Sequence, residues 1–232
     1  MILSHRYKFI FLKTMKTAGS SIEIALSRYC GEGDILTPFG PDEEVLRDRQ
    51  DYQGAQNYWM PYHMYSRHDW LNLLRGRRKM IHHHIRAERV RQLVGEKVWG
   101  SYVKLSVERN PWDKAISFYY YSTRDQAARP PLIEFLRQAR DKHTLSNFPI
   151  YSIGDVVAAD YVMRFEKLDD EMTCLQELLK LPEKPDLPRA NASSRADRRH
   201  YSQVLTDEER ELIAEVCARE IKLFGYQFET LQ

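Results

Sequence analysis

Two short apolar runs in this chain each lead into a polar loop and then into a helical pattern, and this repeated arrangement constrains the fold more than any other feature. The first run, Tyr7–Leu12, precedes the loop 13–21. The second run, Tyr102–Val107, precedes Glu108–Pro111. Runs of this length are typical of strands buried on both faces of a parallel sheet. The sequence therefore predicts an α/β fold in which each strand leads through a loop into a helix.

The rest of the chain continues this alternation of strands and helices. The further elements that we predict are a strand at Asp160–Phe165 and helices at Arg86–Val94, Pro131–Arg140, Leu168–Leu181 and 206–224. Thr206 and Glu209 have the spacing of a capping box at the start of the last helix, which Gly225 can end. A chain of 232 residues suits one domain. We expect residues 1–232 to form a single domain with a central parallel sheet flanked by helices.

One long segment, from about residue 31 to residue 80, departs from this pattern. It is rich in Gly, Pro, Tyr, His and charged residues, with little helical spacing before Trp70–Leu74. Connections of that length inside a compact domain are usually functional insertions with some structure of their own. We therefore expect an elaborated insertion here.

Bulk composition names no partner but excludes several classes of protein. The chain carries 35 Lys and Arg against 33 Asp and Glu, and 43% of its residues are hydrophobic. This balance argues against a disordered chain and against a protein that coats nucleic acid. The longest apolar run near the N-terminus, Phe9–Leu12, is too short to span a membrane. Cys30, Cys174 and Cys217 are odd in number and widely spaced, so we expect neither a disulfide framework nor a zinc site.

The loop after the first predicted strand has the chemistry of an anion site. Its backbone amides, the positive end of the following helix and the Lys16 ammonium can all meet a phosphate. Aligning the Lys-Ser/Thr of the Walker pattern with Lys16-Thr17 places Ile10 and Met15 where that pattern requires glycine. The loop therefore differs from that of nucleoside triphosphate hydrolases. We expect Gly19 to let the backbone approach the anion.

The loop after the second strand has a similar arrangement. Asn110 can cap the next helix and Pro111 suits its first turn. Arg109 is suited to a two-point contact with phosphate, and Ser117 lies two turns further on. Two anion sites at the ends of two strands predict a ligand with two separated phosphates.

The two loops together resemble the donor-binding motifs of sulfotransferases that use 3′-phosphoadenylyl sulfate (PAPS). Lys-Thr-Ala-Gly-Ser-Ser is similar to the 5′-phosphosulfate loop, and Arg-Asn-Pro-Trp-Asp-Lys-Ala-Ile-Ser to the 3′-phosphate motif. The first loop is most similar to that of carbohydrate sulfotransferases such as heparan sulfate 2-O-sulfotransferases, with Met15 in place of a proline. The resemblance implies a P-loop-like three-layer domain that binds PAPS and releases 3′,5′-adenosine bisphosphate (PAP).

The resemblance also assigns donor contacts to particular residues. Arg195 is expected at the 3′-phosphate or adenine, with Arg198 and Arg199 as alternatives. The other donor-binding residues that it implies are Lys16, Thr17, Ala18, Gly19, Ser20, Ser21, Arg109 and Ser117. Lys16 would also stabilise charge on the leaving group.

The histidine triplet 82–84 is the candidate for the acceptor side. In extended chain His82 and His84 would project to one face and His83 to the other. No cysteine or acidic cluster with metal-ligand spacing accompanies them, so we expect no metal. His-x-His-Ile-Arg resembles the H-G-H-V-R stretch of 2-O-sulfotransferases, which implies that His82 or His84 is the base for the acceptor hydroxyl. A base with a pKa near neutrality suits that proton transfer.

The acceptor itself is less defined. Arg75–Lys79 is either a solvated loop or part of a site for an acidic glycan, and Tyr58–Tyr65 could stack on sugars or belong to the core. The main hypothesis is sulfuryl transfer to a hydroxyl on a glycan or glycolipid, in the cytoplasm, without a nucleic-acid partner. The alternatives are a P-loop kinase or nucleotide hydrolase that uses the same loop, and a non-enzymatic anion or RNA binder.

Overall fold

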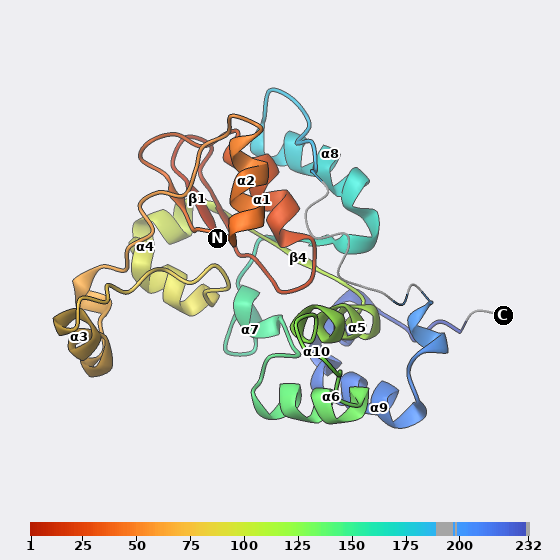
Figure 1. Ribbon diagram of the computed structural model, residues 1–232. Coiled ribbons are helices and arrows are strands. Elements are labelled where there is room, and N and C mark those ends of the chain that lie inside the picture. The colour runs from red at the N-terminus through yellow and green to blue at the C-terminus, as the bar shows by residue number, and fades with distance from the viewer. Residues whose placement is uncertain (189–196, 198, 231–232) are drawn as a thin grey trace.

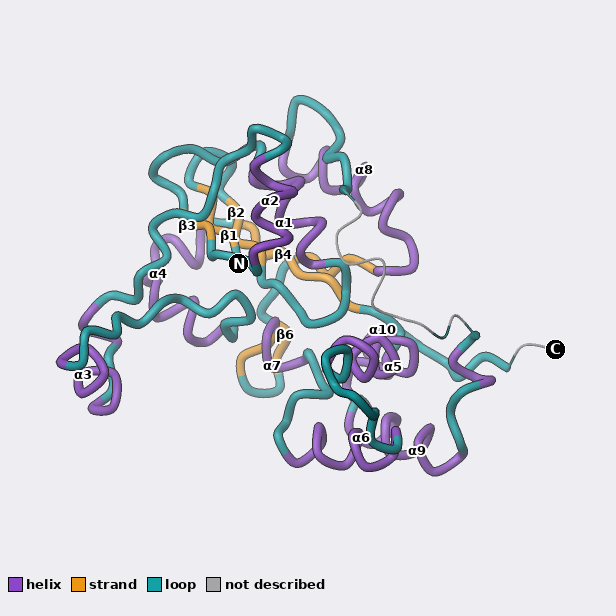
Figure 2. Tube along the Cα trace, viewed as in Figure 1, coloured by secondary structure: helices purple, strands orange, loops and turns teal. Residues whose placement is uncertain are grey.

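The fold is built on one five-stranded sheet with helices on both faces, as the computed structural model shows for residues 1–188, 197 and 199–230 (Figures 1 and 2). The strand order is β3-β1-β2-β4-β7. The strands are β1 (Ile2–Ser4), β2 (Phe9–Phe11), β3 (Ile35–Leu36), β4 (Val103–Glu108) and β7 (Tyr161–Arg164). The predicted strands at Tyr7–Leu12, Tyr102–Val107 and Asp160–Phe165 are thus confirmed, with shorter bounds for the first and third.

The helices alternate with the strands along the chain. In the described residues they are α1 (Gly19–Ser27), α2 (Pro41–Asp48), α3 (Arg67–Leu74), α4 (Ala87–Ser101), α5 (Pro111–Ser122), α6 (Leu132–Asp141), α7 (Phe148–Tyr151), α8 (Leu168–Leu179), α9 (Asp207–Val216) and α10 (Ala218–Phe224). Short 3-10 turns lie at Tyr62–Met64, Phe165–Lys167 and Tyr201–Gln203, and a small hairpin pairs β5 (Ser152–Ile153) with β6 (Val156–Val157). Among the described residues, none of the helices has the length and the apolar composition that a membrane span needs.

The prediction of a wholly parallel sheet is wrong at one strand. β2, β4 and β7 are parallel neighbours, but β1 pairs antiparallel with both β2 and β3. Only four residues join β1 to β2, and so short a connection permits a hairpin but not the crossover that parallel strands require. The sheet is therefore mixed at one edge and parallel where the loops after β2 and β4 leave it.

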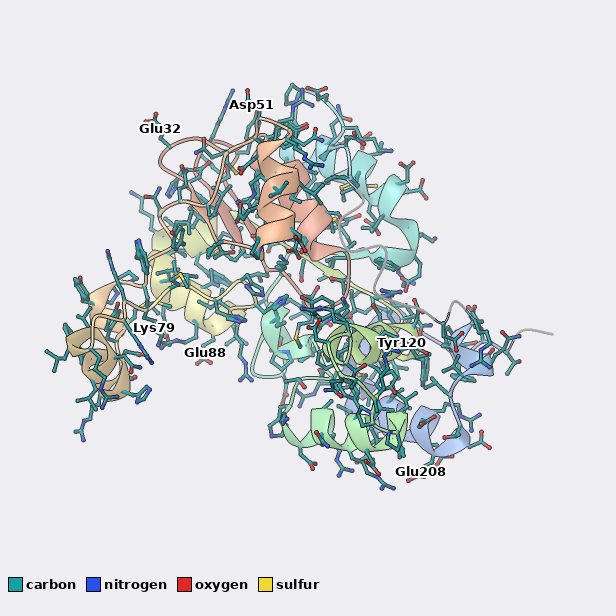
Figure 3. All side chains as sticks on the ribbon, viewed as in Figure 1. Glu32, Asp51, Lys79, Glu88, Tyr120 and Glu208 are labelled. Atoms are coloured by element: carbon teal, nitrogen blue, oxygen red, sulfur yellow. The ribbon has the colours of Figure 1, made fainter. Side chains whose placement is uncertain are left out.

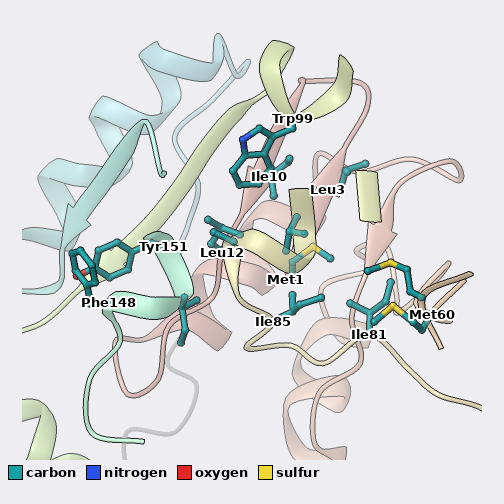
Figure 4. Close-up of a cluster of buried hydrophobic side chains, with 14 residues drawn as sticks. Met1, Leu3, Ile10, Leu12, Met60, Ile81, Ile85, Trp99, Phe148 and Tyr151 are labelled. Carbon is teal, nitrogen blue, oxygen red and sulfur yellow. The ribbon is translucent and has the colours of Figure 1, made fainter. Parts of the chain in front are cut away.

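The residues of β2 show why the sheet is buried on both faces. Phe9 and Phe11 pack with Ile22 of α1 on one face. Ile10 and Leu12 point to the other face, where Figure 4 shows them in a cluster with Trp99 of α4 and with Phe148 and Tyr151 of α7. Alternate side chains of a strand point to opposite faces, so one apolar run supplies two cores. A third cluster joins α5, α6 and α9 beside the sheet.

Helix ends follow the predicted caps. The Asn110 side chain accepts hydrogen bonds from the backbone N–H groups of Trp112 and Asp113, at 3.1 and 3.4 Å. Thr206 and Glu209 form the predicted reciprocal capping box. These caps confirm where α5 and α9 begin.

The prediction of one continuous C-terminal helix is wrong. Cys217, with φ −102° and ψ 22°, separates α9 from α10, and Gly225 ends α10 in the left-handed region as predicted. The bend brings Glu220 inward, where its carboxylate accepts hydrogen bonds from Ser146 and from the Asn147 amide. Likewise, the helix predicted at Arg86–Val94 continues to Ser101 through a kink at Gly95.

Candidate active site

One cleft collects the predicted motifs. It has a volume of about 860 Å³ and lies where the loops after β2 and β4 leave the sheet. Its lining residues are Lys13, Thr14, Met15, Lys16, Thr17, Ala18, Gly19, Ser20, Ser21, Phe39, Gly40, Glu43, His82, His83, His84, Arg109, Ser117, Phe118, Tyr121, Phe165, Leu168, Leu187 and Pro188. The loop, the second motif and the histidine triplet are far apart in sequence, and the fold brings them to one place.

The first loop ends at an uncapped helix start. Lys16 and Ala18 both have left-handed backbone angles, with φ of 60° and 58°. Within the described residues, no side chain caps α1, and the Ile22 N–H makes the first helical bond, to the Ala18 carbonyl at 3.1 Å. The amides of the first turn, which precede that bond, belong to residues that line the cleft. The positive end of the helix therefore faces the cleft, as an anion site requires.

Thr17 and Gly19 shape this loop from within. The Thr17 hydroxyl is buried and lies 2.8 Å from the Thr14 hydroxyl. It therefore stabilises the loop by an internal hydrogen bond and does not point a free hydroxyl into the cleft. A Cβ at Gly19 would lie 2.8 Å from Cγ of Lys13, whose Nζ is fixed 3.0 Å from Glu23. Glycine is therefore needed here for internal packing as well as for the access to an anion that we predicted.

Lys16 is the cation of this loop. Its Nζ lies 3.7 Å from the centroid of the Tyr121 ring on α5. Burial, and then the nearby Arg109 and Arg124 guanidinium groups, lower the pKa of Lys16 to about 8. A partly desolvated ammonium of this kind gains from a bound anion, which would favour its charged form.

Arg109 joins the second motif to the first loop. Its Nε and Nη2 donate to Oδ2 of Asp113 at 2.8 and 2.5 Å, and its Nη1 donates to the Lys16 carbonyl at 3.0 Å. The guanidinium carbon lies 4.0 Å from the centroid of the Phe165 ring. The fork that we expected to face a phosphate is thus held by Asp113, while Ser117 lines the same cleft.

Arg195, Arg198 and Arg199 are the candidates for the second arginine predicted at the donor. Arg195 and Arg198 lie outside the described residues. Arg199, the remaining alternative, pairs with Asp197 at 2.6 Å and lines a separate hollow with Tyr201.

The histidine triplet forms a turn instead of an extended strand. The Ile85 N–H donates to the His82 carbonyl at 3.0 Å. Because the chain turns here, the predicted alternation is wrong: the His83 ring lies 4.5 Å from the His82 ring and 4.3 Å from the His84 ring, between centroids. All three histidines line the cleft.

The hydrogen bonds of His82 and His84 distinguish the two rings. Nδ1 of His84 lies 2.8 Å from the Lys13 carbonyl, which can only accept, so Nδ1 carries the hydrogen and Nε2 is the basic nitrogen. Nδ1 of His82 accepts the His84 backbone N–H at 3.1 Å, which leaves the hydrogen of neutral His82 on Nε2. Burial lowers the pKa of His82, and it lowers those of His83 and His84 to about 4 and about 3. In the free protein the pKa of His84 therefore lies well below the near-neutral value that we expected for the base.

Asn147 is a site residue that sequence reasoning missed. Its Oδ1 accepts the Met15 N–H at 3.0 Å, and its Nδ2 donates to the Met15 carbonyl at 3.1 Å and to Glu108 Oε1 at 3.2 Å. These bonds fix the residue directly before Lys16. Asn147 is 132 positions away along the chain, and no local pattern marks it.

The described residues contain no group of three or more His, Cys, Asp or Glu side chains that could hold a metal ion. Of the insertion 31–80, only Phe39, Gly40 and Glu43 line the cleft. The basic run Arg75–Lys79 and the aromatic stretch Tyr58–Tyr65 lie elsewhere, so neither forms part of this cleft.

Comparison with known proteins identifies the family. The model of the sulfotransferase family matches residues 1–227, and the chain therefore belongs to that family of transferases. An uncharacterized protein of Archaeoglobus fulgidus is 30% identical over 102 residues, which are 42% of this chain and 84% of that protein. No solved structure matches the chain.

Proposed function

We propose that this protein transfers the sulfuryl group of PAPS to a hydroxyl of an acceptor, most simply a glycan or glycolipid. The observation that carries the proposal is that one cleft contains the loop before α1 with Lys16, the motif with Arg109 and Ser117, and the histidine turn. An anion site, a second cation and a buried base are the groups that such a transfer needs. Membership of the sulfotransferase family supports the reaction class.

The residues at one end of the cleft fit the donor. Amides at the start of α1 and the Lys16 ammonium suit the 5′ end of PAPS. The N–H groups of Arg109 that are not bonded to Asp113 or to the Lys16 carbonyl, together with Ser117, suit the 3′-phosphate. Bound PAPS would supply the sulfuryl group and a phosphate leaving group. Lys16 would stabilise the negative charge that collects on the bridging oxygen as the sulfur–oxygen bond breaks.

His84 suits the role of base at the acceptor. Its unprotonated Nε2 can take the hydroxyl proton while the acceptor oxygen bonds to sulfur, and its Nδ1–H is held by the Lys13 carbonyl. The electron pair of the breaking bond stays on the phosphate oxygen, so charge and atoms balance with PAP and a sulfated acceptor as products. His82 instead carries its hydrogen on Nε2. This N–H group can donate a hydrogen bond to an oxygen of the bound substrate and so bind or polarise it.

The alternative of a kinase or nucleotide hydrolase has no support in the family assignment, and its loop lacks the Walker glycines. The single-domain organisation, the absence of a metal from the reaction and a cytoplasmic location stay predictions.

Two measurements test the proposal. Calorimetry should show that PAP binds and that ATP binds far more weakly, and transfer of label from PAPS should be seen with at least one member of a panel of glycans and glycolipids. Tight binding of ATP without binding of PAP would contradict the proposal. Loss of PAP binding in Lys16→Ala, but not in the exposed-lysine control Lys97→Ala, would link the binding to the predicted loop.

A further inference from the structure

A projecting arm, residues 58–80, stands away from the sheet and carries α3 at its tip (Figure 1). Two extended segments form its stem: the Met60 N–H donates to the Lys79 carbonyl at 3.0 Å, and the Ile81 N–H to the Tyr58 carbonyl at 2.7 Å. Met60 and Ile81 are buried in the core cluster of Figure 4 and anchor the stem. Met64 of the arm is buried in the same cluster, so the arm is fixed at its root, while most of its side chains from Ser66 to Arg78 are exposed.

The apolar face of α3 is turned to water. Trp70, Leu71 and Leu74, at helical spacing with Arg67, share one face of the helix. Their exposed fractions are 47%, 54% and 85%, and no residue of α3 is buried. A surface helix normally buries its apolar stripe against the core. Here the Trp70 ring packs on Tyr62 and Tyr65 of the arm itself, and all three apolar side chains of the face stay exposed.

The exposure is part of an ordered structure. Ser66 and Asp69 form a capping box at the start of α3. Asp69 also pairs with Nζ of Lys79 at 2.6 Å, which ties α3 to the stem. The Tyr65 and Trp70 rings pack with 5.4 Å between centroids. The tip is therefore held with its apolar side chains outward.

The same arm is strongly basic. Between residues 58 and 80 five Lys and Arg side chains accompany one carboxylate, that of Asp69, and Lys79 is labelled on the arm in Figure 3. Arg75, Arg77 and Arg78 are exposed, and Arg78 lies over the Trp59 ring at 4.9 Å. A two-fold contact between copies would set this patch against itself, and the like charges disfavour that arrangement. Charge complementarity therefore favours an anionic partner.

We propose that the arm binds the surface of an anionic lipid membrane. Trp70, Leu71 and Leu74 would enter the boundary between headgroups and acyl chains, while Arg75, Arg77 and Arg78 contact lipid phosphates. Exposed Trp and Leu beside Arg and Lys are the combination that favours interfacial binding without a membrane span. This binding does not depend on the proposed transfer reaction.

Co-sedimentation with vesicles tests the proposal. We expect the protein to bind vesicles of equal parts phosphatidylglycerol and phosphatidylcholine, and to bind pure phosphatidylcholine much more weakly. Combined Arg75→Gln, Arg77→Gln and Arg78→Gln should weaken binding about 100-fold, because each charge contributes about fivefold. Combined Leu71→Ala and Leu74→Ala should weaken it roughly tenfold or more.

Two control variants use exposed side chains elsewhere. Lys97→Gln with Lys142→Gln and Lys222→Gln removes three charges, and Leu178→Ala with Leu223→Ala removes two leucines. Both should bind vesicles like the unmodified protein. Unchanged PAP binding and thermal unfolding of the arm variants would show that they are folded.

Three outcomes would overturn the proposal. The first is that the protein does not bind anionic vesicles, and the second is that the arm variants bind them as well as the unmodified protein does. The third is that the protein forms concentration-dependent dimers instead of binding vesicles, and that the double variant Leu71→Ala, Leu74→Ala is monomeric. Quenching of tryptophan fluorescence by brominated acyl chains, lost in Trp70→Phe, would give independent support. Vesicle binding and sulfuryl transfer are tested separately, and we expect His84→Ala to bind vesicles like the unmodified protein. Failure of the transfer assay would therefore not count against membrane binding.

Discussion

His84 and His82 are two positions apart and line the same cleft, yet their rings offer opposite atoms to a ligand. The Lys13 carbonyl fixes the hydrogen of His84 on Nδ1, whereas the His84 backbone N–H occupies Nδ1 of His82. Which nitrogen is protonated therefore follows from the turn of the main chain. This distinction separates two candidates that sequence spacing treats as equivalent.

We predict that His84→Ala lowers transfer by about 10²- to 10⁴-fold, the range for loss of a general base. His82→Ala should lower it much less, and His68→Ala, on the arm, should not change it. PAP binding should remain in all three variants. If His84→Ala kept full activity with the true acceptor, the assignment of the base would be wrong.

The pH profile gives a second test of the same residue. Because burial lowers the pKa of His84 to about 3, its basic form is populated throughout the range above pH 4. We expect kcat/KM to change little between pH 7 and pH 5, where a base with the ordinary pKa of about 6.5 would lose about 25-fold. A decline centred near pH 6.5 would contradict the burial of this ring.

Lys16 should make donor binding sensitive to alkaline pH. Its pKa is about 8 in the free protein, and a bound phosphate favours the ammonium, so the complex holds the proton at higher pH than the free protein does. Affinity for PAP should therefore fall above about pH 8, by up to about tenfold per pH unit, whereas Lys16 contributes little change between about pH 6.5 and pH 7. Calorimetry from pH 6.5 to 9.5 measures this. Lys16→Met should bind weakly without the fall, and Lys97→Met should keep it.

At the scale of elements, the position of the first loop depends on Asn147, the residue directly before α7. Asn147 pairs with both main-chain groups of Met15 in the manner of a neighbouring strand. It also contacts Glu108 at the end of β4, so it joins the two strands whose loops form the cleft. We regard Asn147 as a positioning residue for Lys16.

Asn147→Ala should remove these bonds and raise the KM for PAPS roughly tenfold with a smaller change in kcat, since each bond contributes about 0.5–1.5 kcal/mol. Asn147→Asp should be worse, because it sets a carboxylate beside Glu108. Thr144→Ala, which removes a hydroxyl hydrogen-bonded to the Ala139 carbonyl, is the matched control. Equal KM values in all three variants would exclude the positioning role.

At the scale of the whole molecule, one buried charge joins the sheet to the C-terminal helices. Nζ of Lys114 on α5 lies 3.1 Å from Glu108 on β4 and 3.8 Å from Glu220 on α10. Burial alone would lower the pKa of Lys114, but the two carboxylates, Glu108 above all, raise it. The lysine therefore stays charged and holds two buried acids together.

Lys114→Met should leave both carboxylates unpaired and destabilise the fold by about 3–5 kcal/mol. For a chain of this size that corresponds to a fall in Tm of about 10 °C. Differential scanning calorimetry measures it, with the exposed Lys142→Met as control. A fall of less than about 2 °C would mean that the network contributes little to stability.

Short-range physics explains what the sequence alone determined. Some features depend only on residues within about one turn of each other, so the sequence pattern predicts them. They are the β2 strand, the helix caps Asn110 and Thr206, and the helix end at Gly225. The positions of the two loops were likewise predicted, because each follows its own strand directly; that they bind anions stays a prediction. Membership of the sulfotransferase family agrees with that interpretation.

Other features depend on contacts between residues that are distant in sequence, so no local pattern predicts them. The break at Cys217 and the contact of Asn147 with Met15 each depend on residues far away in sequence. The turn at His82–Ile85 replaced the predicted alternation, because the main chain there bends to place His84 against the Lys13 carbonyl. Local pattern selects the elements and their loops, whereas burial and long-range hydrogen bonds select which atoms meet in the cleft.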